Sequence, residues 1–226
     1  MMTLTKKGYI ANIAANTIIV LLMITAIIMM FNINVAALSE ANKWANFKYF
    51  TVLSNVYMGI ASAISLFYLF FKKDNYPNWL VTLKLSGTVS VFITFITTML
   101  YLAPLMGFWP VMQGANFIMH LVLPLSALLT YIFFEPKLKT PFWHFIFGMA
   151  PVSIYGIIYL INVAVKNDFG NVNGADWYLF GAYGIGPGIG VLAGLIIASF
   201  GFTILFKFLH KLIIVKSLYN EKAEQE

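Results

Sequence analysis

The chain alternates long apolar segments with short polar joints. Six segments are mostly apolar and about 20 residues or more in length, enough to cross roughly 30 Å of hydrocarbon as a helix. The joints between them carry lysine, acidic residues, asparagine and proline. The pattern predicts an all-α fold, a polytopic membrane helical bundle that forms a single domain over residues 1–226. The six predicted transmembrane helices cover about residues 9–31, 47–71, 80–105, 114–134, 142–165 and 183–212.

Composition excludes a soluble domain. Of the 226 residues, 61% are hydrophobic and 10% are charged, whereas an average soluble domain carries roughly 25% charged residues. So few charged side chains cannot cover the surface of a protein of this size, and a disordered chain would lack this much Phe, Ile and Leu. The chain has no Cys, which excludes disulfides, thiolate metal sites and Cys nucleophiles. No group of residues indicates a metal or another cofactor.

The placement of lysine predicts the orientation of the helices. All the basic residues are Lys, which is typical of an AT-rich bacterial genome and indicates the bacterial inner membrane. Lys43, Lys48 and Lys166 fall on one side of the predicted bundle, and the other eleven lysines fall on the opposite side. The positive-inside rule then predicts a multi-pass protein of the cell membrane with both termini in the cytoplasm. Topology and contact with anionic lipids explain the net charge of +6, so we expect membrane lipids and no nucleic acid as partners. The sequence does not indicate an oligomeric state.

Several predicted helices carry polar side chains on one face. Polar groups within a bilayer tend to face the bundle interior, so converging polar stripes predict an internal pocket. We expect the pocket to open toward the outer leaflet. The alternative is that each hydroxyl bonds back to its own helix or joins two helices. The residues expected to line the pocket are Thr51, Asn55, Thr94, Asn116 and His120.

His120 is the candidate for chemistry. Lys84 is grouped with the cytoplasmic lysines, which makes His120 the only strongly ionisable side chain expected deep in a span. The spans lack the second His of a bis-His haem site and the further ligands of a zinc site. General-base work needs only one His and one nucleophile within reach. Thr51, with Ser54 and Asn55 beside it, is the hydroxyl cluster at matching depth.

Two motifs carry a resemblance to a known family. Residues 47–55 read FKYFTVLSN and residues 116–124 read NFIMHLVLP. In this order and on these helices, they resemble the motifs of the androgen-induced and androgen-dependent TFPI-regulating membrane proteins. Members of that family are six-helix hydrolases of fatty-acid esters of hydroxy fatty acids, with a Thr nucleophile and a His. The resemblance implies that Thr51 is the nucleophile and His120 is its base.

The chain departs from the family pattern at two positions. Phe117 stands where the family has its first His, and Leu121 stands where a Thr follows the second His. Both departures leave the proposed pair intact, and the expected substrates are fatty-acid esters of hydroxy fatty acids or related lipid esters. The rival interpretation is a small membrane transporter or a lipid-binding membrane protein without catalysis.

Further residues receive expected roles in the hydrolase. Asn116, one turn before His120, is expected to orient the imidazole, and Asn55 or Ser54 to donate to the oxyanion. Lys48 lies near Thr51 and closer to water, where it would hold a lipid carboxylate, although snorkelling explains it equally well. The residues expected to contact the substrate are Lys48, Thr94, Tyr101 and Tyr155.

Overall fold

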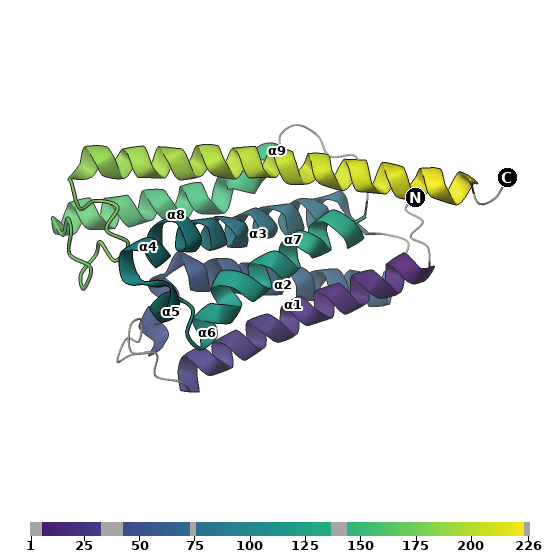
Figure 1. Cartoon of the computed structure of the whole chain (residues 1–226), viewed down its shortest axis with the longest axis horizontal. Coiled ribbons are helices and arrows are strands. Elements are labelled where there is room, and N and C mark those ends of the chain that lie inside the picture. Colours follow the sequence, from purple (N-terminus) through teal and green to yellow (C-terminus); the bar gives the residue numbers. More distant parts are fainter. Residues whose placement is uncertain (1–5, 33–42, 73–75, 137–143, 224–226) are drawn as a thin grey trace.

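The computed structural model describes residues 6–32, 43–72, 76–136 and 144–223, and it contains no strand in these ranges. Six long helices dominate the described part of the chain, and Figure 1 shows them lying side by side as a bundle. The predicted all-α class is confirmed. The six helices are α1 (Lys6–Asn32), α2 (Phe50–Phe71), α3 (Asn78–Thr97), α7 (Leu123–Phe134), α8 (His144–Lys166) and α9 (Ile185–Ala223).

Short elements extend or connect these helices. A 3-10 helix, η1 (Lys43–Lys48), precedes α2. The π-helix η2 (Thr98–Leu102) continues α3 into α4 (Ala103–Met106), and α5 (Phe108–Val111) follows. The next span consists of α6 (Ala115–Phe117), the π-helix η3 (Ile118–Val122) and α7.

Within the described ranges, six helices are long and apolar enough to cross a membrane, which identifies a multi-pass membrane protein. Their bounds agree with the predicted spans to within three residues, except that residues 142–143 of the fifth span lie outside the described ranges. The second helix starts at Phe50 because residues 47–48 belong to η1. The observed spans are Gly8–Asn32, Phe50–Phe71, Asn78–Met106, Ala115–Phe134, His144–Lys166 and Ile185–Ile213.

The bundle has two distinct ends. In Figure 1, α1 begins and α9 ends on the same side, which we name the terminal end. The opposite side, the loop end, carries residues 167–184 between α8 and α9, together with α4, α5 and the start of α2. Consecutive spans therefore run in alternating directions along the bundle axis.

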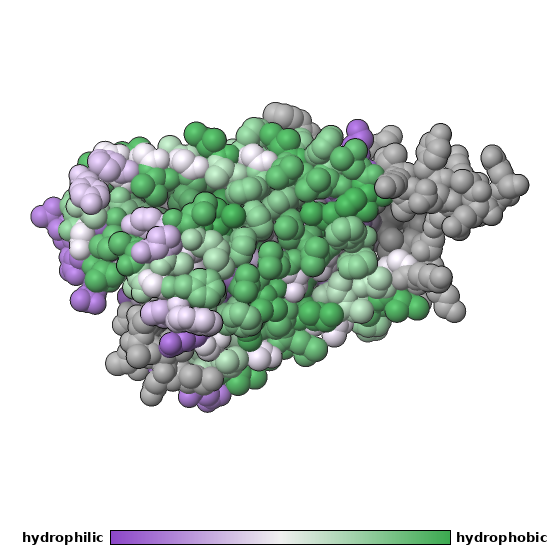
Figure 2. All heavy atoms as spheres, viewed as in Figure 1, coloured by the Kyte–Doolittle hydropathy of each residue, from purple (hydrophilic) through white to green (hydrophobic). Residues whose placement is uncertain are grey.

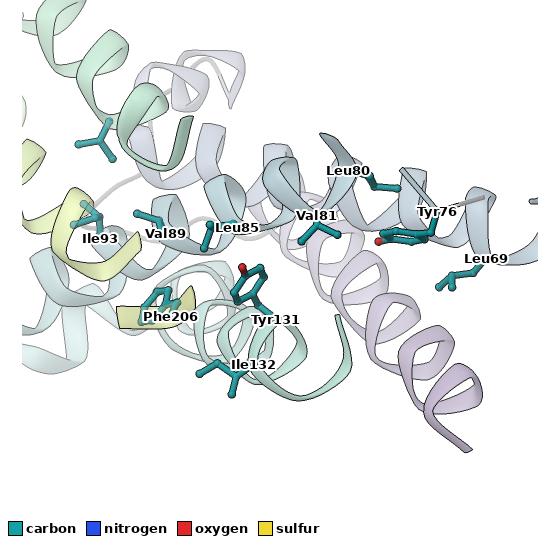
Figure 3. Packing of buried hydrophobic residues seen from close by; sticks show 11 residues of the cluster. Leu69, Tyr76, Leu80, Val81, Leu85, Val89, Ile93, Tyr131, Ile132 and Phe206 are labelled. Carbon is teal, nitrogen blue, oxygen red and sulfur yellow. The ribbon is translucent and has the colours of Figure 1, made fainter. Parts of the chain in front are cut away.

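Helix α3 lies at the centre of the bundle, in contact with α2, α7, α8 and α9. Small and hydroxyl residues allow the backbones of these helices to approach closely. Close packing matters in a bilayer because lipid provides no hydrophobic force that drives helices together. A Cβ added at Gly87 would lie 2.9 Å from Met58 Sδ. Figure 3 shows side chains of α3 from Leu80 to Ile93 packed beside Tyr131, Ile132 and Phe206 of α7 and α9.

Side chains from neighbouring helices satisfy backbone carbonyls that the helices leave open. Pro151 lies inside α8 and has no N–H to donate to the carbonyl of Phe147. The Ser86 hydroxyl of α3 donates to that carbonyl at 2.7 Å. At the terminal end, Tyr9 donates to Leu69 O at 2.6 Å, near the end of α2. Such bonds matter in a bilayer because no water is available to replace them.

The outer surface of the bundle is apolar. Figure 2 shows hydrophobic residues along the visible face and hydrophilic residues gathered at the loop end. Several large apolar side chains on this surface are half exposed or more, for example those of Ile28, Phe67, Ile161 and Ile197. In water such a surface would promote aggregation, but in a bilayer it contacts lipid chains.

Candidate functional site

A cavity lies near the loop end, between α2, α3, η2, α8, α9 and residues 167–184. Its empty volume is about 560 Å³, its open mouth included. Aliphatic side chains and aromatic rings form most of the wall, and threonine hydroxyls interrupt it on the side of α2 and α3. The lining residues are Phe50, Thr51, Ile93, Thr94, Thr97, Thr98, Leu102, Val152, Tyr155, Gly156, Tyr159, Leu160, Tyr178, Phe180, Leu192 and Leu195.

Thr51 lies in the first turn of α2 and in the cavity wall. Its carbonyl accepts hydrogen bonds from Ser54 Oγ at 3.1 Å and Asn55 Nδ2 at 2.7 Å. Ser54 Oγ is also 3.1 Å from Thr94 Oγ1 of α3, another lining residue. These bonds fix the first turn of α2 against α3, with the Thr51 side chain at the cavity.

The segment between α8 and α9 contributes Tyr178 and Phe180 to the cavity wall at the loop end. Asp176 is fully buried in it, and its carboxylate accepts hydrogen bonds from Gly170 N, Gly181 N and the Tyr159 hydroxyl. Gly170 has a φ of 74°, a left-handed conformation that favours glycine. The buried carboxylate thus holds the turns of this segment together and ties them to α8.

Tyr178 joins this segment to the start of α2. Its hydroxyl oxygen accepts a hydrogen bond from Phe50 N at 2.9 Å, and its backbone carbonyl accepts one from Tyr101 Oη at 3.1 Å. Burial raises the pKa of the Tyr178 hydroxyl to about 12, and the Phe50 N–H and the Tyr155 and Thr51 hydroxyls oppose that rise. At neutral pH the Tyr178 hydroxyl is therefore protonated and can donate a hydrogen bond near Thr51.

His120 is buried in the π-helix η3 and is not a lining residue of the cavity. Pro124, four residues later, has no N–H for the His120 carbonyl, and the helix there bonds instead from Leu123 N to Ile118 O. His120 Nδ1 lies 2.7 Å from Val111 O. A carbonyl oxygen only accepts, so Nδ1 carries the proton and the neutral ring keeps a lone pair on Nε2.

Asn55 links the two halves of the predicted pair. Its Nδ2 donates to Thr51 O and to Met119 O, the latter at 3.1 Å, so it joins α2 to the residue before His120. No hydrogen bond connects the Thr51 and His120 side chains within the described ranges. Of the residues expected to share a pocket, Thr51 and Thr94 line this cavity, whereas Asn55, Asn116 and His120 are not among its lining residues.

The remaining predicted residues divide between the cavity and its surroundings. Tyr155 lines the cavity, and its hydroxyl donates to Lys48 O at 2.7 Å. The Lys48 ammonium lies 5.1 Å from the Tyr49 ring centroid, outside the lining. Tyr101 bonds to the Tyr178 carbonyl and is not a lining residue. Asn116 Nδ2 is buried without a hydrogen-bond partner and makes no bond to the imidazole.

A second buried polar cluster lies toward the terminal end. Lys84, expected near the cytoplasmic interface, is fully buried in α3, so His120 is not the only ionisable group at depth. Lys84 Nζ is 2.6 Å from Asn16 Oδ1, 2.8 Å from Ser62 Oγ and 3.6 Å from Glu135 Oε1. Glu135 Oε2 accepts from the Tyr76 hydroxyl at 3.1 Å. This cluster connects α1, α2 and α3 to the end of α7.

Sequence reasoning missed Tyr178 and Asp176 because both lie in a joint between spans. Helical periodicity identifies polar faces within the apolar segments, but it marks no residue of an irregular segment. One signal was present: residues 167–184 combine glycine and asparagine with Trp177, Tyr178 and Phe180, an aromatic content unusual for an exposed joint.

The comparisons with known proteins add no relative. No family model, no curated protein and no solved structure matches this chain.

Proposed function

We propose that the protein hydrolyses a lipid ester, with the Thr51 hydroxyl as the nucleophile. The observation that carries the proposal is the position of Thr51 in the wall of a mostly apolar cavity, beside the Tyr178 hydroxyl. An apolar cavity within a membrane protein suits a lipid chain, and a hydroxyl in its wall can reach an ester carbonyl.

His120 is the proposed general base. The hydrogen bond from Nδ1 to Val111 O leaves the Nε2 lone pair to accept the Thr51 proton. Asn55 supports this pairing because it joins the Thr51 turn to Met119, next to His120. Since no direct hydrogen bond joins the two side chains in the described structure, the transfer requires one bridging water or a closing movement of η3.

Tyr178 is the proposed oxyanion donor, in place of Asn55 and Ser54. Both hydrogens of the Asn55 amide are engaged by Thr51 O and Met119 O, and the Ser54 hydroxyl already donates to Thr51 O. The Tyr178 hydroxyl accepts from Phe50 N and keeps its own proton for the substrate. Its pKa of about 12 keeps that proton in place at neutral pH.

The chemical steps balance without a cofactor. The Thr51 proton passes to His120 Nε2 while Thr51 Oγ1 attacks the ester carbonyl. The tetrahedral intermediate collapses, the ester C–O bond breaks, and the leaving alkoxide takes the proton from His120. A water molecule then attacks the acyl-threonine with His120 again as base, which releases the acid and restores Thr51.

A specific observation favours a second candidate, a lipid-binding protein or small transporter without catalysis. His120 is not a lining residue of the cavity, and its Nδ1 donates to a backbone carbonyl, as expected of a histidine that only braces helices. In that case the cavity would hold a lipid that is not consumed. The two candidates differ in whether Thr51 reacts.

We further propose an orientation in the membrane from the distribution of lysine. Both termini would lie in the cytoplasm of a bacterial cell, and the loop end, with the cavity, would face the outer leaflet of the inner membrane. A reporter fused after Glu226 tests this, since only a cytoplasmic reporter should be active.

The catalytic proposal is tested by turnover of a panel of lipid esters in detergent. Thr51→Ala and His120→Ala should each remove nearly all hydrolysis, and the double variant should be scarcely worse, because groups that act as one unit are not additive. Thr51→Ser keeps the hydroxyl and should keep measurable activity. His120→Gln should fail, because an amide cannot accept the proton. Near-normal activity of His120→Gln would support the bracing role instead.

A further inference from the structure

Aromatic rings gather at one end of the cavity. Its wall includes Phe50, Tyr155, Tyr159, Tyr178 and Phe180, all near the loop end. Their ring centroids are closely spaced, with 5.0 Å between Phe50 and Tyr155 and 5.7 Å between Tyr159 and Phe180. Toward the terminal end, the wall changes to Ile93, Val152 and Leu195. Leu102, Leu160 and Leu192 also line the wall among the rings. We name the part of the cavity that the five rings line the aromatic chamber.

The tyrosines of the aromatic chamber present rings rather than hydroxyls to most of the cavity. The Tyr155 hydroxyl donates to Lys48 O and accepts from Trp177 Nε1 at 3.2 Å. The Tyr159 hydroxyl donates to Asp176 and accepts from Tyr178 N at 3.2 Å. These partners belong to η1 and the segment between α8 and α9. Ring faces carry partial negative charge and attract cations, above all weakly hydrated ones.

A buried carboxylate reinforces this attraction. Asp176 is fully buried and bonds to Tyr159, a ring of the chamber wall. All its hydrogen-bond donors are neutral, and within the described ranges no lysine or histidine lies at salt-bridge distance from it. A hydroxyl that donates to a carboxylate enriches its own ring in electrons. The chamber therefore has a negative group behind its wall.

Two rings just outside the aromatic chamber, those of Tyr49 and Trp177, already attract one cation. Lys48 Nζ lies 5.1 Å from the Tyr49 ring centroid and 5.3 Å from that of Trp177. Neither ring lines the cavity, so this ammonium approaches from outside and does not occupy the chamber.

We propose that the aromatic chamber binds a quaternary ammonium group, and that the substrate is a lipid ester carrying this group near its carbonyl. The acyl chain lies along Ile93, Val152 and Leu195, the carbonyl lies at Thr51, and the ammonium lies among the rings. The assignment deepens the proposed function and rests on it for the position of the ester. A quaternary ammonium is favoured over a primary one because it is weakly hydrated and needs no hydrogen-bond acceptor.

Two probes of equal shape separate charge from hydrophobic fit. Lauroylcholine carries a trimethylammonium group, and 3,3-dimethylbutyl laurate carries a neutral tert-butyl group in its place. Binding is measured on Thr51→Ala in a neutral maltoside detergent, so that neither ester is consumed. The reporter is the fluorescence of Trp177, whose Nε1 bonds to Tyr155, and Trp177→Phe shows which part of the signal it supplies.

Lauroylcholine should bind about tenfold tighter than the neutral ester or better, as expected for a desolvated cation on aromatic rings. The binding ratio is the affinity for lauroylcholine divided by the affinity for the neutral ester. Tyr159→Leu and Asp176→Asn should each reduce this ratio, and Tyr159→Phe should reduce it less than Tyr159→Leu. Equal or tighter binding of the neutral ester would overturn the proposal, and that comparison needs no folded variant beyond Thr51→Ala. Free choline that binds as tightly as lauroylcholine would contradict a lipid ligand.

The outcomes for binding and for catalysis are separable. A high binding ratio with no hydrolysis by the wild-type chain would keep the ammonium site and remove the hydrolase. Hydrolysis of neutral esters with a ratio of one or less would keep the hydrolase and remove the ammonium site.

Discussion

Asn55 Nδ2 lies 3.1 Å from Met119 O and ties the first turns of α2 to the π-helix that carries His120. The same amide also donates to Thr51 O, so one side chain supports both members of the proposed pair. Because the amide is fully buried, its removal would take this donor from Met119 O and would leave Thr51 O with the Ser54 hydroxyl as its side-chain donor.

Asn55→Ala should therefore lower stability by about 1–3 kcal/mol, the usual effect of leaving buried groups unbonded. It should also lower ester hydrolysis at equal folded amounts, because α2 and η3 lose their link. Thermal unfolding in detergent and turnover measure the two effects. Ser153→Ala is the control, since among the described residues its hydroxyl bonds only to Met149 O of its own helix. Unchanged stability of Asn55→Ala would show that this bond does not hold the site.

Ser86 and Pro151 test whether a hydroxyl from α3 replaces the backbone hydrogen bond that Pro151 cannot donate to Phe147 O. Ser86→Ala should cost about 1 kcal/mol because the hydrogen bond from Ser86 Oγ to Phe147 O is lost. In a Pro151→Ala background the new backbone N–H at position 151 can bond to Phe147 O, and the cost of Ser86→Ala should largely disappear. A double-mutant cycle of thermal stability measures this coupling. Equal costs in both backgrounds would contradict it.

The pair of Lys84 and Glu135 should behave as a buried salt bridge. Lys84→Met or Glu135→Gln alone should destabilise the protein by about 3–5 kcal/mol, because each leaves a buried charge without its partner. The double variant should recover much of that loss. Unfolding of the three variants in detergent gives the coupling, and additive losses would mean that the two groups act independently.

Tyr178 should contribute to stability below alkaline pH. Burial raises the pKa of its hydroxyl to about 12 in the folded protein, above the usual value of about 10. Its contribution is complete below pH about 10 and is lost as the pH rises toward about 12, since the unfolded chain releases the proton first. Between pH 9 and 11 the free energy of unfolding of the wild type should therefore fall by about 1 kcal/mol more than that of Tyr178→Phe. Parallel pH profiles of the two proteins would contradict the assignment.

The six spans follow from the sequence because length and apolar content alone decide whether a helix can cross a bilayer. Thr51 and Thr94 were placed on inward faces because the helical period fixes which side chains share a face. The period does not fix how two helices turn toward each other. For that reason the period predicts a common pocket for Thr51, Asn116 and His120, although only Thr51 of the three lines the cavity.

Two features had no local signal. The sequence predicts that Lys84 lies at the membrane interface. Its burial depends on Glu135, which is distant in the sequence and lies beside it in the fold. Tyr178 and Asp176 act through bonds to backbone groups and to α8, and such bonds depend on tertiary structure. The contribution of residues 167–184 to the candidate site therefore could not be predicted from the sequence.

The central claim, that Thr51 is a nucleophile, is tested most directly by covalent labelling. The purified protein is treated with a lipid-like fluorophosphonate, and the modified residue is identified by peptide mass spectrometry. The account predicts one adduct per chain on Thr51, a much weaker signal in His120→Gln, and no adduct in Thr51→Ala. Labelling of Thr51→Ala equal to that of the wild type, or an absence of label on wild type that hydrolyses a lipid ester, would contradict it.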